Sequence, residues 1–341
     1  MIRSSKFQLE DQTRTKNSEV IKIYQEYVRL VNEYIRRFYY FDAPFNMDTF
    51  HSVGSFIPAM YKSNANRQAY QIVQLIRKDK KAKCPIFHGE MKLDHKLVDI
   101  YMDNPNSFDL WIRLTSTKFR KRVYLPCRRH KQFNKWLEQG TLKQAIAIKY
   151  LNDKLRFRLC IDIPDKPKKE SGETIGCDVG YNKLLATSDN KIYGKEIKQI
   201  VDKIYRRQTG SKRKIKSIEQ RQNYVGQELN KLNLSNIHTL VIEDIKELKK
   251  HRKMGKLQYW SYRQAFDKLE RLCQENCVHL VKVNPAYTSQ KCSTCGFVDK
   301  ANRLGERFKC LKCGTELDAD FNASLNIRDR SLESLSFHRH L

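Results

Sequence analysis

The segment KCSTCGFVDKANRLGERFKCLKCGTELDADFNASLNI (residues 291–327) contains two cysteine pairs, then an acidic cluster, then an apolar run with helical spacing. This arrangement has two explanations. Either the cysteines form a free-standing module with surface acids beside it, or they form an insertion that delivers Asp320 to an active site. The rest of the chain is needed to choose between them.

The cysteines of this segment follow the spacing C-x2-C-x14-C-x2-C. Each C-x2-C pair can turn two thiolates toward one tetrahedral cation, and four thiolates complete a structural zinc site. Gly296 and Gly314 directly follow the second cysteine of each pair, where a tight turn favours a positive φ. The alternative is a set of buried or disulfide-paired cysteines. The predicted zinc ligands are Cys292, Cys295, Cys310 and Cys313.

The whole chain is strongly basic. Its 341 residues include 66 Lys and Arg against 38 Asp and Glu, which gives a formal net charge of +28. This balance indicates an anionic partner, chiefly nucleic acid. No segment approaches the ~18 consecutive apolar residues of a membrane-spanning helix, and the start MIRSSKFQLEDQTRTKNSEV lacks the apolar stretch of a signal peptide. We therefore expect a cytoplasmic protein without a membrane partner, in which the cysteines are reduced or bind metal.

The hydrophobic pattern changes along the chain. Residues 16–40 and 66–83 carry apolar side chains at helical spacing, which predicts a helical unit at the start. From about 107 to 163 the segments FDLWIRLT, KRVYLP and LRFRLCIDI alternate apolar with polar residues, which predicts a β-rich unit such as a small barrel. The polar segment 164–173 indicates a linker or a long surface turn. After it, TIGCDVG, LLATSDN and HTLVIEDI predict strands of a second domain.

Three acids stand at the ends of predicted elements in this second domain. Asp178 follows one apolar strand, Glu243 closes another, and Asp320 precedes the last helix. Each has a simpler role open to it, because Asp178 can cap a turn, Glu243 can pair with a following lysine, and Asp320 can cap its helix. Converged, the carboxylates could bind two Mg²⁺ ions about 4 Å apart for phosphodiester hydrolysis. The combination in a basic chain indicates an RNase H-like nuclease core.

At these positions the sequence resembles a known family. The segments GCDVGYNKLLATSDN, NYVGQELNKL, LVIEDIKEL, VNPAYTSQKCSTCGFV, FKCLKCG and DADFNASLNI are similar to TnpB, the RNA-guided nuclease of bacterial and archaeal insertion sequences, which is related to type V CRISPR effectors. The resemblance implies that Asp178, Glu243 and Asp320 are the catalytic acids of a RuvC-type domain and bind Mg²⁺ or Mn²⁺. It assigns this role to Asp320 rather than Asp318, and it makes the cysteines a zinc ribbon inserted before the third acid.

The resemblance also implies a domain organisation. Residues 1–9 and 101–172 are expected to form a wedge-like β-barrel, residues 10–100 a helical recognition insertion, and residues 173–330 an α/β RuvC-like nuclease domain. Its zinc ribbon is expected at 288–317 and a flexible tail at 331–341. The expected activity is RNA-guided cleavage of target double-stranded DNA by two-metal hydrolysis. The expected partner is a guide RNA from a transposon end, in a bacterial, archaeal or phage-encoded protein at the nucleoid. An RNA-guided DNA-binding regulator without cleavage and an unguided transposase are the alternatives.

A basic segment between the predicted strands is the candidate nucleic-acid contact. YRRQTGSKRKIKSIEQR (205–221) lies on or beside a predicted helix, and KELKKHRKMGK (246–256) follows Glu243. Such cations would bind backbone phosphate and add little sequence information, which base pairing with a guide would supply. The predicted contact residues are Arg206, Arg207, Lys212, Arg213, Lys214 and Lys216.

Overall fold

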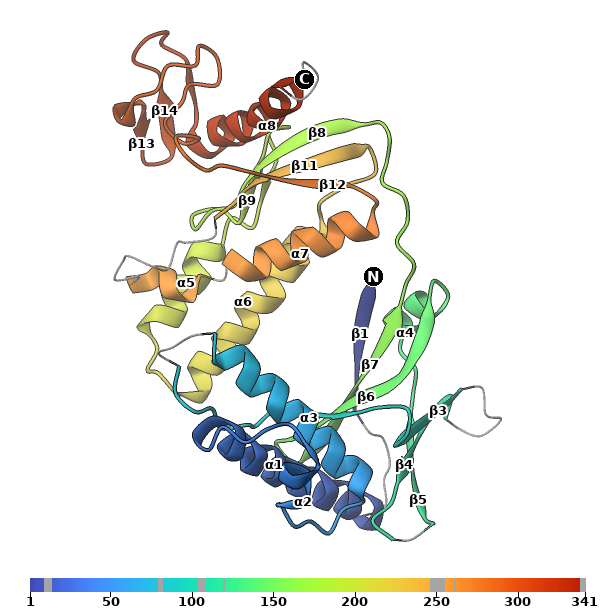
Figure 1. The fold of residues 1–341 in the computed structure, drawn as a ribbon. Coiled ribbons are helices and arrows are strands. Elements are labelled where there is room, and N and C mark those ends of the chain that lie inside the picture. Colours follow the sequence, from blue (N-terminus) through green and yellow to red (C-terminus); the bar gives the residue numbers. More distant parts are fainter. Residues whose placement is uncertain are drawn as a thin grey trace. The chain divides into compact units, whose positions relative to one another are not determined.

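The computed structural model describes residues 1–8, 14–78, 82–102, 108–118, 120–245, 255–260 and 262–337. The chain divides into two compact units, Met1–Asp165 and Lys166–Leu341, which run from blue to green and from green to red in Figure 1. Among the described helices, none is both long enough and apolar enough to cross a membrane.

The first unit combines helices with two antiparallel sheets. In its described part, one sheet has the strand order β1-β7-β6-β2 and the other the order β3-β4-β5. β1 pairs with β7, so the start of the chain lies in the same sheet as the strands formed after residue 140. The elements are β1 (Ile2–Gln8), α1 (Arg14–Tyr40), α2 (Met47–His51), α3 (Ala59–Ile76), β2 (Met91–Leu93), β3 (Val98–Met102), β4 (Leu110–Thr115), β5 (Arg122–Cys127), α4 (Lys131–Leu137), β6 (Thr141–Leu151) and β7 (Lys154–Asp162).

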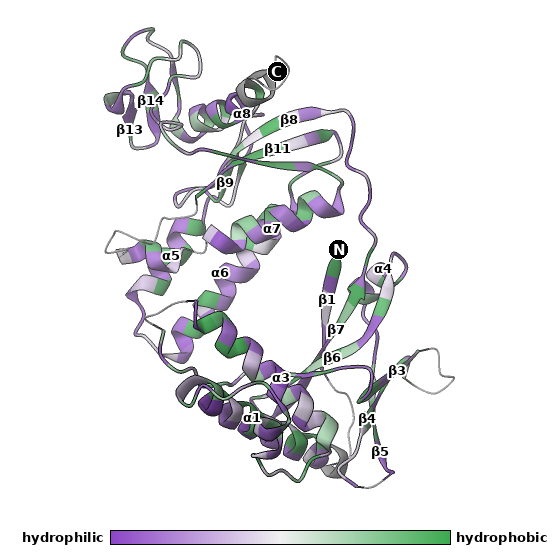
Figure 2. Ribbon diagram, in the orientation of Figure 1, coloured by the Kyte–Doolittle hydropathy of each residue, from purple (hydrophilic) through white to green (hydrophobic). Residues whose placement is uncertain are grey.

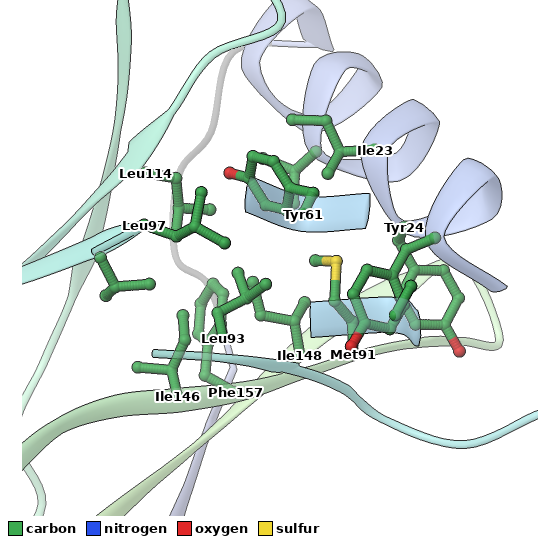
Figure 3. Close-up of a cluster of buried hydrophobic side chains, with 14 of the residues drawn as sticks. Ile23, Tyr24, Tyr61, Met91, Leu93, Leu97, Leu114, Ile146, Ile148 and Phe157 are labelled. Atoms are coloured by element: carbon green, nitrogen blue, oxygen red, sulfur yellow. The ribbon is translucent and has the colours of Figure 1, made fainter. Parts of the chain in front are cut away.

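Both sheets and the long helices of this unit share one hydrophobic core. α1 presents one apolar face to it, and Tyr27 and Tyr34 on that face are fully buried. In β2, Met91 and Leu93 point inward while Lys92 between them is exposed, as strand geometry requires. Figure 3 shows Met91 and Leu93 packed among side chains of α1, α3, β4, β6 and β7.

Two strands of the first unit fall in or next to the range expected to be helical. The long helices end with α3 at Ile76, and β2 and β3 follow at 91–93 and 98–102, against an expected helical insertion over 10–100. β2 pairs with β6 along only three residues, which is too short a run for alternation to identify. The assignment of this unit to wedge and recognition domains stays a prediction.

The second unit is a mixed α/β domain. In the part that the structure describes, its main sheet has the order β10-β9-β8-β11-β12, and a small sheet has the order β13-β14-β15. β8, β11 and β12 are parallel, whereas β9 is antiparallel to β8. The elements are β8 (Glu173–Asp178), β9 (Leu185–Thr187), β10 (Ile192–Tyr193), α5 (Ile197–Arg206), α6 (Lys212–Asn230), β11 (Ile237–Glu243), the 3-10 helix η1 (Gly255–Tyr259), α7 (Tyr262–Glu275), β12 (His279–Val283), the 3-10 helix η2 (Lys300–Asn302), β13 (Arg303–Leu304), β14 (Arg307–Lys309), β15 (Glu316–Asp318) and α8 (Ala319–Phe337).

Helices cover both faces of the main sheet, with α7 and α8 on opposite sides (Figure 1). Cys177 and Ile242 belong to the core that includes α7, whereas Ile327 of α8 packs on the other face. Because successive strand residues point to opposite faces, Asp178 and Glu243 face the α8 side. In Figure 2, hydrophobic and hydrophilic segments alternate along α7, as expected for a helix with one buried face.

Two segments of the second unit differ from the sequence-based expectation. α8 continues to Phe337, so residues 331–337, expected to be a flexible tail, are helical, and 338–341 lie outside the described residues. The polar segment 164–173, expected to be a linker or a long surface turn, belongs to the second unit from Lys166 onward. The Nζ of Lys168 donates to the carbonyl of Val278 at 2.9 Å, and the N–H of Lys169 donates to the carbonyl of Cys277 at 2.8 Å.

Candidate functional site

Two parallel strand ends place two carboxylates side by side. Cys177 of β8 is in register with Ile242 of β11. The next residues, Asp178 and Glu243, therefore leave the sheet at the same edge and on the same face. The turn after Asp178 is closed by the backbone, because the N–H of Gly180 donates to the carbonyl of Leu184 at 3.4 Å. The carboxylate of Asp178 is thus not needed to close it.

Asp320 reaches the same edge from the start of α8. The helix is capped by Asp318, whose Oδ1 accepts hydrogen bonds from the N–H groups of Asp320 and Phe321, both at 3.1 Å. The simpler role considered for Asp320 thus belongs to Asp318. The side chain of Asp320 instead lines a pocket at the strand ends, where the residue is 9% exposed.

The close approach of α8 to the sheet depends on Gly176 of β8. A Cβ at this position would lie 2.1 Å from the carbonyl oxygen of Ser324 and 2.5 Å from the backbone nitrogen of Arg328. Only glycine lets the helix backbone lie this close to the strand. Ser324 is about one helical turn beyond Asp320, so this contact fixes how far the third acid stands from the strand ends.

The three predicted acids line one pocket of about 350 Å³, together with Thr288 and Arg303. Burial, together with the charges of Glu243 and Asp320, raises the pKa of Asp178 to about 8. Burial also raises the pKa of Glu243, although its Oε1 accepts a hydrogen bond from the Thr288 hydroxyl. Carboxylates that resist ionisation next to one another favour a site that binds a cation.

Two basic side chains contact these acids, and sequence reasoning missed both. Nη2 of Arg303 lies 2.7 Å from Oδ1 of Asp320. Nζ of Lys183 lies 2.5 Å from Oδ2 of Asp318 and 3.5 Å from Oδ2 of Asp320. Lys183 lies in the turn after β8, and Arg303 follows η2 between the two cysteine pairs. Arg303 lies outside the segments that resemble the TnpB family, and Lys183 lies inside one of them but the resemblance assigns it no role.

The four cysteines fit a zinc ion. Among the described residues, theirs is the one group of three or more His, Cys, Asp or Glu side chains whose ligand atoms all lie within 4.8 Å of one another. The Sγ atoms of Cys292 and Cys313 are 3.7 Å apart, and those of Cys295 and Cys310 are 3.6 Å apart. Sulfurs bound tetrahedrally at about 2.3 Å from zinc would be about 3.8 Å apart, whereas a disulfide needs about 2.05 Å. The cluster could therefore bind zinc, and the disulfide alternative does not apply.

The two cysteine turns have matching geometry. Gly296 and Gly314 have φ values of +75° and +76°, which confirms the expected positive φ. Their N–H groups donate to the carbonyls of Cys292 and Cys310 at 2.9 and 3.0 Å. We call residues 288–317 the cysteine clip.

The cysteine clip is attached to α8. Asn322 of α8 is fully buried; its Nδ2 donates to the carbonyl of Lys291 at 2.9 Å, and its Oδ1 accepts from the N–H of Ser293 at 3.0 Å. Asn326, one turn further on, donates to the carbonyls of Thr288 and Lys291 at 2.9 and 2.7 Å. The clip is thus no free-standing module, because the helix that carries Asp320 is fastened to its first cysteine turn.

The basic residues expected to contact nucleic acid divide into two groups. Lys214 is 5% exposed, and its Nζ donates to the carbonyl of Arg207 at 3.0 Å, to Oγ1 of Thr209 at 3.2 Å and to the hydroxyl of Tyr259 at 2.8 Å. This corrects the expectation for Lys214, because a buried ammonium with these three bonds cannot reach a phosphate. Arg207 is half-buried and donates to the carbonyl of Arg213.

The other predicted contacts are exposed on α5 and α6. The segment 246–254 lies outside the described residues. The exposed set is Arg206, Lys212, Arg213 and Lys216.

Comparisons with known proteins show which proteins the chain is similar to. A family model described as the Cas12f1-like TNB domain matches residues 262–327. The CRISPR-associated endodeoxyribonuclease Cas12f1 of Sulfoacidibacillus thermotolerans is 37% identical over 100 residues, which cover 28% of this chain and 23% of that protein. A TnpB-like protein of Aquifex aeolicus (strain VF5) is 36% identical over 74 residues, which cover 21% of this chain and 24% of that protein.

The fold is similar to that of Cas12f1 in a cryo-EM structure of a Cas12f1–sgRNA–target DNA complex, with a TM-score of 0.60 and 18% identity, over 92% of this chain and 82% of that chain. The matches support a TnpB/Cas12f-type protein. A second similar structure is the mini-RNA-guided endonuclease CRISPR-Cas_phi3, with a TM-score of 0.55 and 12% identity over 97% and 92% of the two chains. These likenesses show a mixed α/β fold like that of Cas12 effectors.

The TnpB/Cas12f-type sequence match is local. The family model runs from the start of α7 through the cysteine clip into α8, and so includes Asp320 but neither Asp178 nor Glu243. The matched segments span about a quarter of the length of the relatives, 23% and 24% in the two cases above.

Proposed function

We propose that this chain is an RNA-guided DNA endonuclease of the TnpB type, in which Asp178, Glu243 and Asp320 are the catalytic acids of a RuvC-like, RNase H-like core. The observation that carries the proposal is their convergence. Two neighbouring strand ends and a helix start, far apart in sequence, contribute carboxylates to one pocket. Relatives named endodeoxyribonucleases and the strongly basic chain support it.

The pocket suits Mg²⁺ or Mn²⁺, because hard divalent cations prefer oxygen ligands and the three carboxylates supply them. Such ions, when bound, activate water and stabilise the leaving oxygen of a phosphodiester. The chain itself does the positioning. β8 and β11 hold Asp178 and Glu243, the Thr288 hydroxyl orients Glu243, and α8 delivers Asp320.

The remaining parts of the proposal concern zinc and nucleic acid. The cysteine clip would bind a structural zinc ion, whose binding energy is folding energy for this segment. The exposed cations of α5 and α6 would bind backbone phosphate of a guide RNA from a transposon end and of target double-stranded DNA, while guide pairing sets the sequence. A protein of similar fold was solved in a complex with sgRNA and target DNA, which supports these partners. With chromosomal DNA as the target, the protein would act in the cytoplasm, at the nucleoid.

RNA-dependent cleavage tests the proposal. The protein is purified from cells that also carry the DNA flanking its gene, its bound RNA is sequenced, and the complex is incubated with a plasmid library and Mg²⁺. We expect cleavage at sites that match the RNA. Cleavage is lost in Asp178→Ala but kept in Asp267→Ala, a control that removes an acid 60% exposed on α7 and outside the pocket.

Two outcomes would replace the proposal by its alternatives. If wild-type and Asp178→Ala proteins both bind matching DNA and both leave it intact, the protein is an RNA-guided regulator. If strand-transfer products form without RNA, it is a transposase.

A further inference from the structure

A cation of the chain itself lies in the acid pocket. The Arg303 side chain is 27% exposed and binds Asp320, which is 12% exposed by its side chain, through a hydrogen bond of 2.7 Å. Its positive charge also opposes the upward pKa shifts of Asp178 and Glu243. One guanidinium thus acts on all three carboxylates, from within the pocket that they line.

The cysteine clip determines where this guanidinium lies. Asn302, directly before it, is buried between the two cysteine turns. Its Nδ2 donates to the carbonyl of Gln290 at 3.0 Å, and its Oδ1 accepts from the N–H of Leu311 at 3.0 Å. Nε of Arg303 in turn donates to the carbonyl of Gly305 at 3.2 Å. The contacts of Asn302 and of the Arg303 side chain hold this guanidinium in place. Unlike a cation from solvent, it therefore stays beside the pocket when it is not bound to Asp320.

Lys183 does not take the same place. Its Nζ is closer to Asp318, at 2.5 Å, than to Asp320, at 3.5 Å. Asp318 is the cap of α8, so Lys183 mainly stabilises the start of the helix. Arg303 makes the shorter contact with the third acid.

We propose, on the basis of the function proposed above, that Arg303 is a tethered counter-cation that holds the three acids together in the metal-free protein and is displaced from Asp320 when a divalent cation binds. The guanidinium and a divalent cation repel each other and compete for the same carboxylate oxygen. Arg303 is thus a positioning residue that sets the cation concentration at which the pocket fills. In the absence of that cation it offsets the repulsion between the buried carboxylate of Asp320 and the half-buried ones of Asp178 and Glu243.

Binding of Mn²⁺ to the zinc-loaded full chain, followed by electron paramagnetic resonance, tests this without any cleavage assay. Arg303→Gln removes the charge and keeps a hydrogen-bond donor, and Arg303→Lys keeps the charge. Arg307→Gln is the matched control, because Arg307 belongs to the same clip, is 66% exposed and pairs with Glu316 at 2.7 Å. We expect Arg303→Gln to bind Mn²⁺ on the order of tenfold more tightly than wild type, because a nearby like charge is gone. Arg303→Lys and Arg307→Gln should stay within about twofold, because the local charge is kept or the lost charge is screened by water.

Thermal unfolding of the zinc-loaded protein in buffer without Mg²⁺ or Mn²⁺ gives a second readout. Arg303→Gln should melt below both wild type and Arg307→Gln, because its three acids lack their counter-cation, and Mn²⁺ should remove most of that difference. If Arg303→Gln lowered the melting temperature only because packing contacts are lost, the difference from wild type would persist in saturating Mn²⁺.

Asp178→Asn distinguishes a failure of the proposed function from a failure of the counter-cation proposal alone. If it binds Mn²⁺ as wild type does, the pocket is not a metal site and the proposed function fails with the counter-cation. If Asp178→Asn weakens binding but Arg303→Gln binds no more tightly than Arg307→Gln, the counter-cation proposal alone is overturned.

Discussion

The contact between β8 and α8 predicts a large response to a very small substitution. In Gly176→Ala the new methyl carbon would lie 2.1 Å from the Ser324 carbonyl oxygen, 2.5 Å from the Arg328 nitrogen and 2.8 Å from its Cβ. Contacts under 3.0 Å are essentially never made by real Cβ atoms, so α8 must move away. The required shift is about 1 Å, in a core packed as densely as a crystal.

The loss in the free energy of unfolding depends on which atoms block the new methyl group. Overpacking costs about 1–3 kcal/mol, and the upper part of that range applies here because the obstacle is helix backbone, which cannot rotate aside as a side chain can. Asp320 moves with α8, so the pocket widens as well. A displacement of about 1 Å near reacting groups lowers rates by on the order of a hundredfold.

Urea unfolding of the zinc-loaded protein measures the change in the free energy of unfolding. The rate of target cleavage reports the displacement of Asp320. Gly226→Ala is the matched control, because Gly226 lies inside α6 and an added Cβ meets nothing within 4 Å. Alanine is the better helix former, so this control should gain about 0.5–1 kcal/mol. The two identical substitutions should therefore change stability in opposite directions. A Gly176→Ala protein as stable as wild type would show that α8 does not rest on β8 as described.

Three further predictions concern single side chains. Cys310→Ser should lower both zinc content, measured by atomic absorption, and melting temperature; unchanged melting after chelation of the wild type would contradict a structural zinc. Lys214→Ala should cost about 1–3 kcal/mol of unfolding free energy because the three hydrogen bonds of a buried ammonium are lost. Lys216→Ala, at an exposed position on the same helix, should leave stability within about 0.5 kcal/mol and weaken RNA binding in filter assays. The reverse pattern would refute the assignment of Lys214 to the interior. The pKa of Asp178, about 8 when folded and about 3.9 when unfolded, means that the folded state retains a proton between these values, so metal-free stability should fall as pH rises through this window. The free energy of unfolding can fall by at most about 1.4 kcal/mol per pH unit. We expect a smaller fall because the pocket is open to water, which screens the charges. Asp178→Asn should flatten this dependence on pH in the zinc-loaded protein without Mg²⁺ or Mn²⁺, and parallel plots of melting temperature against pH for the two proteins would contradict the raised pKa.

The sequence predicted the parts of the site that depend on local pattern. The spacing of the cysteines predicted a cluster, and the structure places their ligand atoms together. The strands before Asp178 and Glu243 could be predicted from their apolar runs, and parallel pairing then brings the two strand ends to one edge. The role of all three acids in catalysis stays a prediction.

The parts that could not be predicted depend on contacts between distant segments. Nothing in the sequence around Gly176 indicates that the backbone of α8 crosses it. Arg303 begins the short strand β13 and Lys183 lies in a turn, and only the folded chain brings them to Asp320. Lys214 has the same kind of neighbours as the exposed lysines beside it. Its burial follows from a face of α6 that is polar in its first half, so the hydrophobic pattern gave no signal there; that face is Lys214, Ser217, Arg221, Val225 and Leu229.

α8 is the last described element of the chain, and the cysteine clip directly precedes it. During synthesis the strands through β12 leave the ribosome first, and on the function proposed above the third acid would take its place only once the clip had bound zinc and folded. A cell short of zinc would then accumulate molecules with a finished sheet and an unfinished pocket. The supply of zinc would thus govern how many newly made molecules mature, and magnesium would only act on those that had.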